Sequence, residues 1–278
     1  MPSIEDKNLR DVPIVVLDTE TTGLYPGLGH RVVEVGAIRF ENWKPVGTFS
    51  QLVQPDWPMH PAASKVVGLT DEDLVGKPRF PEIADQLLDF VEGAIMVAHS
   101  APFDAEFLAL EFSLAKKVRG DGEHVLPNPW ICTLQLARRN FYFGRNNLSH
   151  IANKLRIPVG RAHRALNDVY MTAEVLKRMS QELAKRNIKT VGDFFNAQGD
   201  EIYAPPPPNI DLMPPMDVAV AEKRDLEILY VHNEKTVRRI SPRYAVSHHG
   251  TPYLVAYCHL RQAPRVFRID RIFSATLL

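Results

Sequence analysis

This chain of 278 residues has few cysteines and lacks a long hydrophobic run. Its two cysteines, Cys132 and Cys258, lie far apart beside apolar residues, which argues against a disulfide framework or a zinc site. No apolar run reaches the length of a membrane span. The N-terminal residues Met1-Pro2-Ser3-Ile4-Glu5-Asp6 are too acidic and polar for a signal peptide. Together these absences predict a cytoplasmic protein with reduced thiols.

The chain also lacks net charge, because 33 Lys and Arg balance 33 Asp and Glu. The charges are unevenly distributed, however. Residues 221–278 contain ten basic and five acidic residues, and residues 1–220 have the opposite excess. Such asymmetry indicates a basic tail on an acidic body. The tail is either an ordinary solvated basic face or a surface for nucleic acid or other anions, and charge alone leaves both interpretations open.

Proline is concentrated late in the chain, and this concentration predicts the domain organisation. Residues 196–222 contain a run of four prolines at 205–208 and a pair at 214–215 among polar and small residues. This composition is typical of a semi-rigid, extended linker. We therefore expect one domain at 1–195 and a second, smaller domain at 223–278. No internal repeat is visible.

The first domain shows the pattern of an α/β fold. Apolar or alternating runs predict strands at 14–17, 31–40, 46–53, 95–98 and 130–132. Amphipathic patterns and capping signals predict helices at 60–75, 81–91, 103–117, 133–139, 148–155 and 163–186, with a loop at 120–129. Strands followed by alternating helices and strands imply a mixed sheet with flanking helices.

The second domain shows only short β-like runs. They lie at 226–231, 237–240, 253–260 and 266–269, and turn residues separate them. This spacing predicts a small β-barrel or curled sheet.

The most informative stretch is the apolar run 14–17 with the acids that follow it. Side chains alternate along a strand, so Asp18 and Glu20 point to the same side. Two unpaired acids at the end of a buried strand repel each other, and a divalent cation such as Mg²⁺ or Mn²⁺ removes that cost. The Asp-x-Glu pattern alone means little, because it occurs four times in this chain.

Two further segments place acids or imidazole at the start of a helix. Asp104 follows the strand at 95–98, and Asp168 follows His163 by five residues. Each has an ordinary interpretation in isolation: a helix N-terminal acid, or a surface histidine with a helix-face aspartate. Taken together, four carboxylates and one histidine can surround two cations. Such a pair of metals stabilises the attacking and leaving oxygens of a phosphodiester displacement, while histidine accepts a proton from water.

These motifs, in this order, resemble those of the DEDDh 3′–5′ exonucleases. This family includes the proofreading subunit of bacterial replicative DNA polymerase and ribonuclease T. The residues that carry the resemblance are Asp18-Thr19-Glu20-Thr21-Thr22-Gly23, Phe103-Asp104, and His163 with Asp168. A sister class has tyrosine where this chain has Arg164, so the histidine class fits. The resemblance implies a ribonuclease H-like mixed sheet.

The resemblance also implies roles for individual residues. The metal ligands for two Mg²⁺ or Mn²⁺ ions would be Asp18, Glu20, Asp104 and Asp168, with His163 as the catalytic general base. Three residues would border the 3′-terminal nucleotide, namely Thr19, Thr21 and Leu24. Phe103 would either pack beside the same pocket or belong to the core.

The tail resembles a WYL domain, a small SH3-like barrel thought to bind nucleotide or nucleic-acid ligands. The resemblance lies in 238–242, 252–258 and 265–272. A ligand surface would comprise Arg239, Tyr253, His259, Arg265 and Arg268. Alternatively, Tyr253 belongs to the core and the arginines are merely solvated.

The sequence therefore predicts a metal-dependent exonuclease that releases nucleoside 5′-monophosphates from 3′ ends of single-stranded DNA or RNA, in DNA repair or nucleic-acid degradation. Two alternatives stay open. One is a non-catalytic nucleic-acid or nucleotide sensor on the same fold. The other is a polymerase-associated proofreader, although a Pro-rich linker and a barrel stand here in place of that family's polymerase-binding tail.

Overall fold

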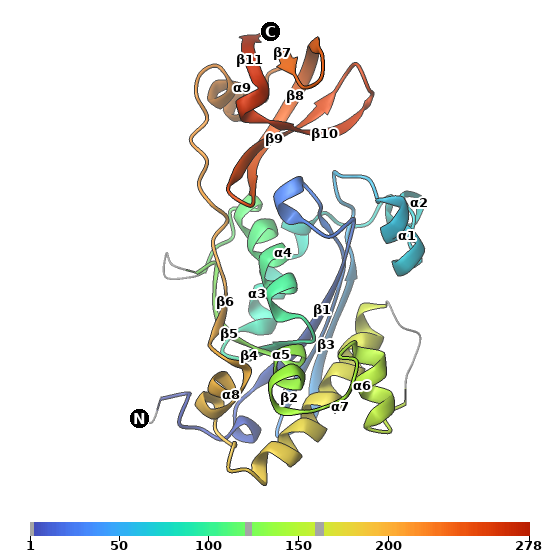
Figure 1. Ribbon diagram of the computed structural model, residues 1–278, viewed down its shortest axis with the longest axis vertical. Helices are drawn as coiled ribbons and strands as arrows, with labels where there is room; N and C mark the ends of the chain where they lie inside the picture. Colours follow the sequence, from blue (N-terminus) through green and yellow to red (C-terminus); the bar gives the residue numbers. More distant parts are fainter. Residues whose placement is uncertain (1–2, 120–123, 159–163) are drawn as a thin grey trace. The chain divides into compact units, whose positions relative to one another are not determined.

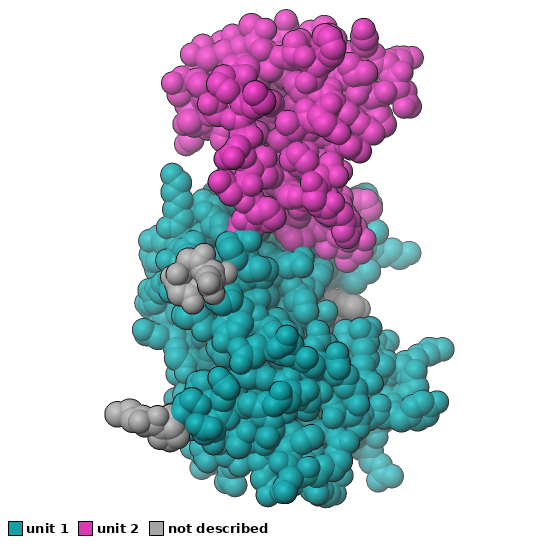
Figure 2. Space-filling model, turned by 60° about the vertical axis from the view of Figure 1, so that its left-hand side comes forward, with its two compact units in different colours: residues 1–21, 32–55, 61–206 teal, residues 22–31, 56–60, 207–278 magenta. Residues whose placement is uncertain are grey.

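The computed structural model describes residues 3–119, 124–158 and 164–278, and Figure 1 shows the course of the chain. The chain forms two compact units, coloured separately in Figure 2. Unit 1 comprises residues 1–21, 32–55 and 61–206, and unit 2 comprises 22–31, 56–60 and 207–278. Within the described ranges no helix is long and apolar enough to cross a membrane. The cytoplasmic location stays a prediction.

The described part of unit 1 contains a six-stranded mixed sheet in the order β3-β2-β1-β4-β5-β6. The central strand β1 is antiparallel to β2 and parallel to β4, and β5 is parallel to β4 but antiparallel to β6. The strands are β1 (Ile14–Thr21), β2 (Val32–Glu41), β3 (Lys44–Leu52), β4 (Ile95–Ala98), β5 (Leu126–Cys132) and β6 (Ile202–Ala204). The predicted α/β class with a mixed sheet is confirmed.

Helices of unit 1 cover both faces of this sheet. The described helices of the unit are α1 (Pro61–Val67), α2 (Asp71–Leu74), α3 (Phe80–Val91), α4 (Ala101–Leu114), α5 (Thr133–Asn140), α6 (Leu148–Lys154), α7 (Ala165–Ala184) and α8 (Val191–Gln198). Helices α3 and α4 lie on one face and α5 to α8 on the other. Strand β1 contributes to two separate cores: Val15 and Leu17 pack with residues of α3 and α4, and Ile14 and Val16 pack with residues of α5 to α8. The apolar run therefore belongs to a strand buried on both faces.

The structure differs from the sequence prediction at strands β5 and β6, which form one edge of the sheet. Residues 126–129, predicted as loop, begin β5 despite two prolines, and the pairing of β5 with β6 is irregular over this stretch. Helix α8 and strand β6 were not predicted. The buried Gln198 explains why α8 docks here, because its side chain accepts from the Cys132 N–H at 2.8 Å and donates to the Trp130 carbonyl at 2.9 Å. Unit 1 thus continues beyond residue 195.

The described part of unit 2 contains a five-stranded antiparallel sheet in the order β10-β9-β8-β7-β11. The strands are β7 (Leu226–Val231), β8 (Lys235–His248), β9 (Thr251–Cys258), β10 (Ala263–Arg268) and β11 (Ile272–Leu277). Strand β8 is much longer than predicted, and β11 was not predicted. Helix α9 (Met216–Glu222) lies in the segment predicted as linker and packs Met216 and Ala219 into this unit's core. The SH3-like closure and the predicted domain boundaries stay predictions.

Candidate metal centre

Strand β1 supplies two carboxylates on one face. Asp18 pairs with Gly36 of β2, and Glu20 pairs with Glu34. The strand continues past the apolar run to Thr21, so both carboxylates are held by regular backbone pairing. Their positions are therefore fixed by the sheet rather than by a loop.

Helix α7 supplies a third carboxylate, and Gly36 permits its approach. A Cβ atom at Gly36 would lie 2.7 Å from the backbone carbonyl carbon of Ala165 and 2.7 Å from the backbone nitrogen of Leu166. The first turn of α7 thus packs directly on β2, beside the position that pairs with Asp18. Any side chain at residue 36 would push α7, and with it Asp168, away from the sheet.

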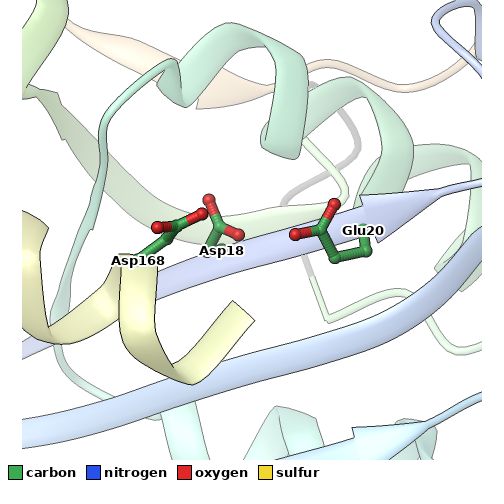
Figure 3. A group of neighbouring side chains, drawn as sticks. All are labelled: Asp18, Glu20 and Asp168. Atoms are coloured by element: carbon green, nitrogen blue, oxygen red, sulfur yellow. The ribbon is translucent and has the colours of Figure 1, made fainter. Parts of the chain in front are cut away.

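The three carboxylates form one group. A ligand oxygen from each of Asp18, Glu20 and Asp168 lies within 4.8 Å of the others. Figure 3 shows the carboxylates of Asp18 and Asp168 side by side, with that of Glu20 turned toward them along β1. Three oxygen donors at this spacing suit a hard divalent cation such as Mg²⁺ or Mn²⁺.

Asp104 lies next to this group. It is buried in the first turn of α4, and its Oδ1 accepts hydrogen bonds from the Thr19 N–H at 3.0 Å and the Thr19 hydroxyl at 2.7 Å. Its charge helps raise the pKa of Asp18, so the two carboxylates are close. The family resemblance predicts that Thr19 borders the terminal nucleotide, and in the structure its hydroxyl donates to Asp104.

Crowding and burial raise the pKa values of these acids. Desolvation, followed by the charges of Asp104 and Glu20, raises the pKa of Asp18 well above its ordinary value. Desolvation, followed by the charge of Asp168, raises the pKa of Glu20 to about 8. Desolvation raises the pKa of Asp104 to about 7, although the hydrogen bonds from Thr19 oppose this shift. The charge of Arg164 offsets part of this effect at Glu20, and a bound cation would offset the repulsion among the acids.

Two residues at the centre were not predicted to belong to the site. Glu34 is 3% exposed, and Arg164 pairs with it at 3.2 Å. The sequence contains a signal for Glu34, because it is a lone acid within the apolar segment 32–38. In the sequence, Arg164 only excludes the sister class of exonucleases, which has tyrosine at this position.

The remaining predicted residues of the site are placed as follows. His163 lies outside the described residues. Thr21 is buried at the end of β1, and Leu24 is 65% exposed in unit 2. Phe103 packs against the core of unit 1, with its ring centroid 4.8 Å from that of Phe107.

The predicted tail surface is divided between two sides of the unit 2 sheet. Strand alternation and register place Arg239, Tyr253 and Arg268 on the side opposite the core. Arg265 alternates to the side of the buried Phe267. His259 follows β9, and its Nε2 lies 2.8 Å from the hydroxyl of Ser241.

Ion pairs already engage two of these arginines. Arg239 pairs with Asp225, and Arg268 pairs with Asp270, each at 2.6 Å. A further cation, Arg238, was not predicted from the sequence, and it lies over the rings of Tyr230 at 5.8 Å and Phe267 at 6.0 Å.

Two family models match this chain. The model described as exonuclease, of the RNase T type, matches residues 15–176, and the WYL domain model matches residues 212–277. The exonuclease match includes all four acids, Asp18, Glu20, Asp104 and Asp168.

Relatives and solved structures agree with these matches. DNA polymerase III subunit epsilon of Treponema pallidum is 37% identical over 179 residues, which cover 63% of this chain and 80% of that protein. The PolC-type DNA polymerase III of Thermotoga petrophila is 30% identical over 251 residues, covering 90% of this chain but only 17% of the polymerase.

Among solved structures, Exonuclease X in complex with 5′ overhanging duplex DNA has a TM-score of 0.51 and 27% identity, covering 67% of this chain and 99% of that one. Exonuclease I of E. coli, solved with a dT13 oligonucleotide, has a TM-score of 0.57 at 16% identity, covering 88% of this chain and 55% of that one. At that identity the second likeness shows the fold alone.

Proposed function

Because the chain belongs to the exonuclease family, in its DEDDh 3′–5′ branch, and has a WYL domain at its C-terminal end, we propose that it releases nucleoside 5′-monophosphates from 3′ ends of single-stranded DNA or RNA. The observation that carries this proposal is the group of Asp18, Glu20 and Asp168, whose ligand oxygens lie within 4.8 Å of one another. A non-catalytic sensor would have no need to maintain so crowded a set of acids at a cost in stability.

The proposed site holds two Mg²⁺ or Mn²⁺ ions through Asp18, Glu20, Asp104 and Asp168. The donor set fits these ions, because it offers only carboxylate oxygens, and a bound cation would offset the repulsion and burial that raise their pKa values. Bound ions would supply charge stabilisation for the attacking and leaving oxygens of the phosphodiester.

A hydrogen-bonding side chain and the backbone pairing of the sheet hold the carboxylates in position. Thr19 fixes one oxygen of Asp104 through two hydrogen bonds, and the sheet pairing fixes Asp18 and Glu20. His163 is proposed to accept the proton of the attacking water. Thr21 and Leu24 are proposed to border the terminal nucleotide, with the exposed Leu24 as an apolar group against the base. Phe103 is proposed to support that pocket from the core.

The test is the release of product from 5′-end-labelled single-stranded DNA and RNA oligomers in Mg²⁺ or Mn²⁺. We expect ladders that shorten by single nucleotides from the 3′ end, the appearance of nucleoside 5′-monophosphates, and no reaction in EDTA. The faster oligomer would identify the substrate class. Binding of oligomer without any product in either metal would refute the proposal and favour the sensor alternative.

A polymerase-associated proofreading role is the second candidate. It is favoured by the relatives named as polymerase III components. The chain spans 17% of the PolC-type relative and 80% of the epsilon subunit, so a shared activity does not imply a shared assembly. Full activity of the isolated chain on free 3′ ends would favour the DNA repair or degradation role over the polymerase-associated one.

For unit 2 we propose a nucleotide or nucleic-acid ligand bound on the side of the sheet that carries Tyr253 and Arg268. These residues pair across β9 and β10, so a ring and a guanidinium lie adjacent on one side. Such a pair can stack on a base and contact a phosphate. A tethered surface of this kind would raise the local concentration of the strand.

Combined Tyr253→Ala and Arg268→Gln replacement tests this proposal. We expect oligomer binding to weaken roughly three- to tenfold, and its salt dependence to fall by about 0.7 for each phosphate that is no longer bound, as for single strands. Fluorescence anisotropy in Ca²⁺ over a salt series measures both quantities. Arg261→Gln, in the exposed turn after β9, is the matched charge control. Unchanged affinity and salt slope would exclude this surface.

A further inference from the structure

A buried acid beside the metal centre is left unused by the proposed mechanism. Glu34 of β2 is 3% exposed and lies opposite Glu20 in the β1–β2 register. Its negative charge adds to those that raise the pKa values of Asp18 and Glu20. A fifth carboxylate here would repel an anionic strand unless a cation accompanied it.

Arg164 is that cation, and its geometry is specific. Its Nε donates to Glu34 Oε2 at 3.3 Å, and its Nη2 donates to Glu34 Oε1 at 3.2 Å. This side-on pairing occupies one edge of the guanidinium and leaves the Nη1 edge outside it. The Arg164 side chain is 42% exposed, whereas that of Glu34 is 4% exposed.

The backbone of Arg164 also holds this residue at the start of α7, next to the acidic group. Arg164 is the N-cap residue of α7, and its carbonyl accepts from the Asp168 N–H at 3.2 Å. Its charge lowers the pKa of Glu20. The guanidinium therefore lies at the rim of the acidic group, oriented by a buried partner, on a side chain that is 42% exposed.

We propose that Arg164, held in orientation by Glu34, binds a backbone phosphate of the nucleic-acid strand. Glu34 engages the Nε and Nη2 atoms and not Nη1, and the Arg164 side chain is 42% exposed, so the pairing leaves the Nη1 edge able to receive a second oxygen anion. That edge presents N–H donors in the planar arrangement that matches phosphate oxygens. The inference rests on the proposed exonuclease function and names a residue that recognises its substrate.

The test compares steady-state cleavage by wild type, Arg164→Lys, and the double variant Arg164→Gln with Glu34→Gln. The double variant removes both charges and so avoids leaving Glu34 buried without a partner. We expect it to raise KM about tenfold or more, the usual effect of removing a hydrogen bond to a charged group, with kcat within about threefold of wild type. The salt slope of KM should fall by about 0.7. Arg164→Lys should recover the salt slope but not the full KM.

The matched control is Arg178→Gln, an exposed arginine further along the same helix α7. It should leave KM, kcat and the salt slope unchanged. An unchanged KM in the double variant, or a fall in kcat alone, would overturn the inference while wild-type cleavage still supported the exonuclease proposal. If wild type cut nothing, oligomer binding in Ca²⁺ would still decide whether Arg164 contacts the strand, by the same comparison of affinity and salt slope.

Discussion

Replacement of Asp168 by asparagine is expected to lower the rate of nucleotide release roughly thousandfold or more, equivalent to about 4 kcal/mol of transition-state stabilisation. Asparagine keeps the shape of the side chain but removes the negative charge. Asp168 contributes one of the three oxygens that lie within 4.8 Å of one another. The change therefore removes a metal ligand while the fold stays intact.

The same variant should be at least as stable as wild type when metal is removed. The charge of Asp168 is among those that raise the pKa values of Asp18 and Glu20, so its removal relieves repulsion in the metal-free protein. Thermal unfolding in EDTA, measured beside single-turnover cleavage in Mn²⁺, separates the two effects. Asp11→Asn, at an exposed aspartate before β1, is the matched control and should change neither. Wild-type cleavage by Asp168→Asn in saturating Mn²⁺ would contradict the assignment.

The acids assigned to this site from the sequence lie in elements with strong local signals. A run of four apolar residues indicates a buried strand whatever surrounds it, and strand alternation then places Asp18 and Glu20 on one face. The apolar run 14–17 is only the first half of the strand, which continues through the acids to Thr21. Pairing with β2 decides where the strand ends, and that pairing is a tertiary contact which local composition does not report.

The missed features share a physical cause. Glu34 and Arg164 are 130 positions apart, and their pairing depends on the approach of α7 to β2 at Gly36. Gln198 likewise stabilises α8 through backbone groups of β5, far away in sequence. Pairwise contacts between distant segments leave no periodic signal, so single-sequence reasoning identifies the elements better than the contacts between them.

The second large effect concerns pH, because metal and protons compete for the same carboxylates. Glu20 has a pKa raised to about 8 and Asp104 a pKa raised to about 7 without metal. Binding of a cation requires the charged forms, so protons must leave. Below these pKa values the apparent affinity for Mn²⁺ is expected to fall about tenfold per pH unit for each proton displaced. Between about pH 8 and pH 6 the loss should approach or exceed roughly a hundredfold.

The stability of the metal-free protein should change with pH in the opposite direction. A carboxylate whose pKa is higher in the folded than in the unfolded protein binds more protons when folded, so the free energy of unfolding decreases as pH rises between the two values. For Glu20 that window runs from 4.5 to about 8. In EDTA the melting temperature should therefore fall from about pH 6 to pH 8, whereas the stabilisation by added Mn²⁺ should grow over the same range.

Differential scanning fluorimetry at about pH 6, 7 and 8, with EDTA or with a Mn²⁺ titration, measures both trends. The Glu20→Gln variant supplies the internal control, because a neutral amide removes one titrating group and should flatten the decline in EDTA. If stabilisation by Mn²⁺ were equal at both ends of this range, the ion would not displace protons from these acids. The carboxylates would then be charged before metal arrived, and the crowding seen between Asp18, Glu20 and Asp168 would have to be compensated by groups of the protein itself.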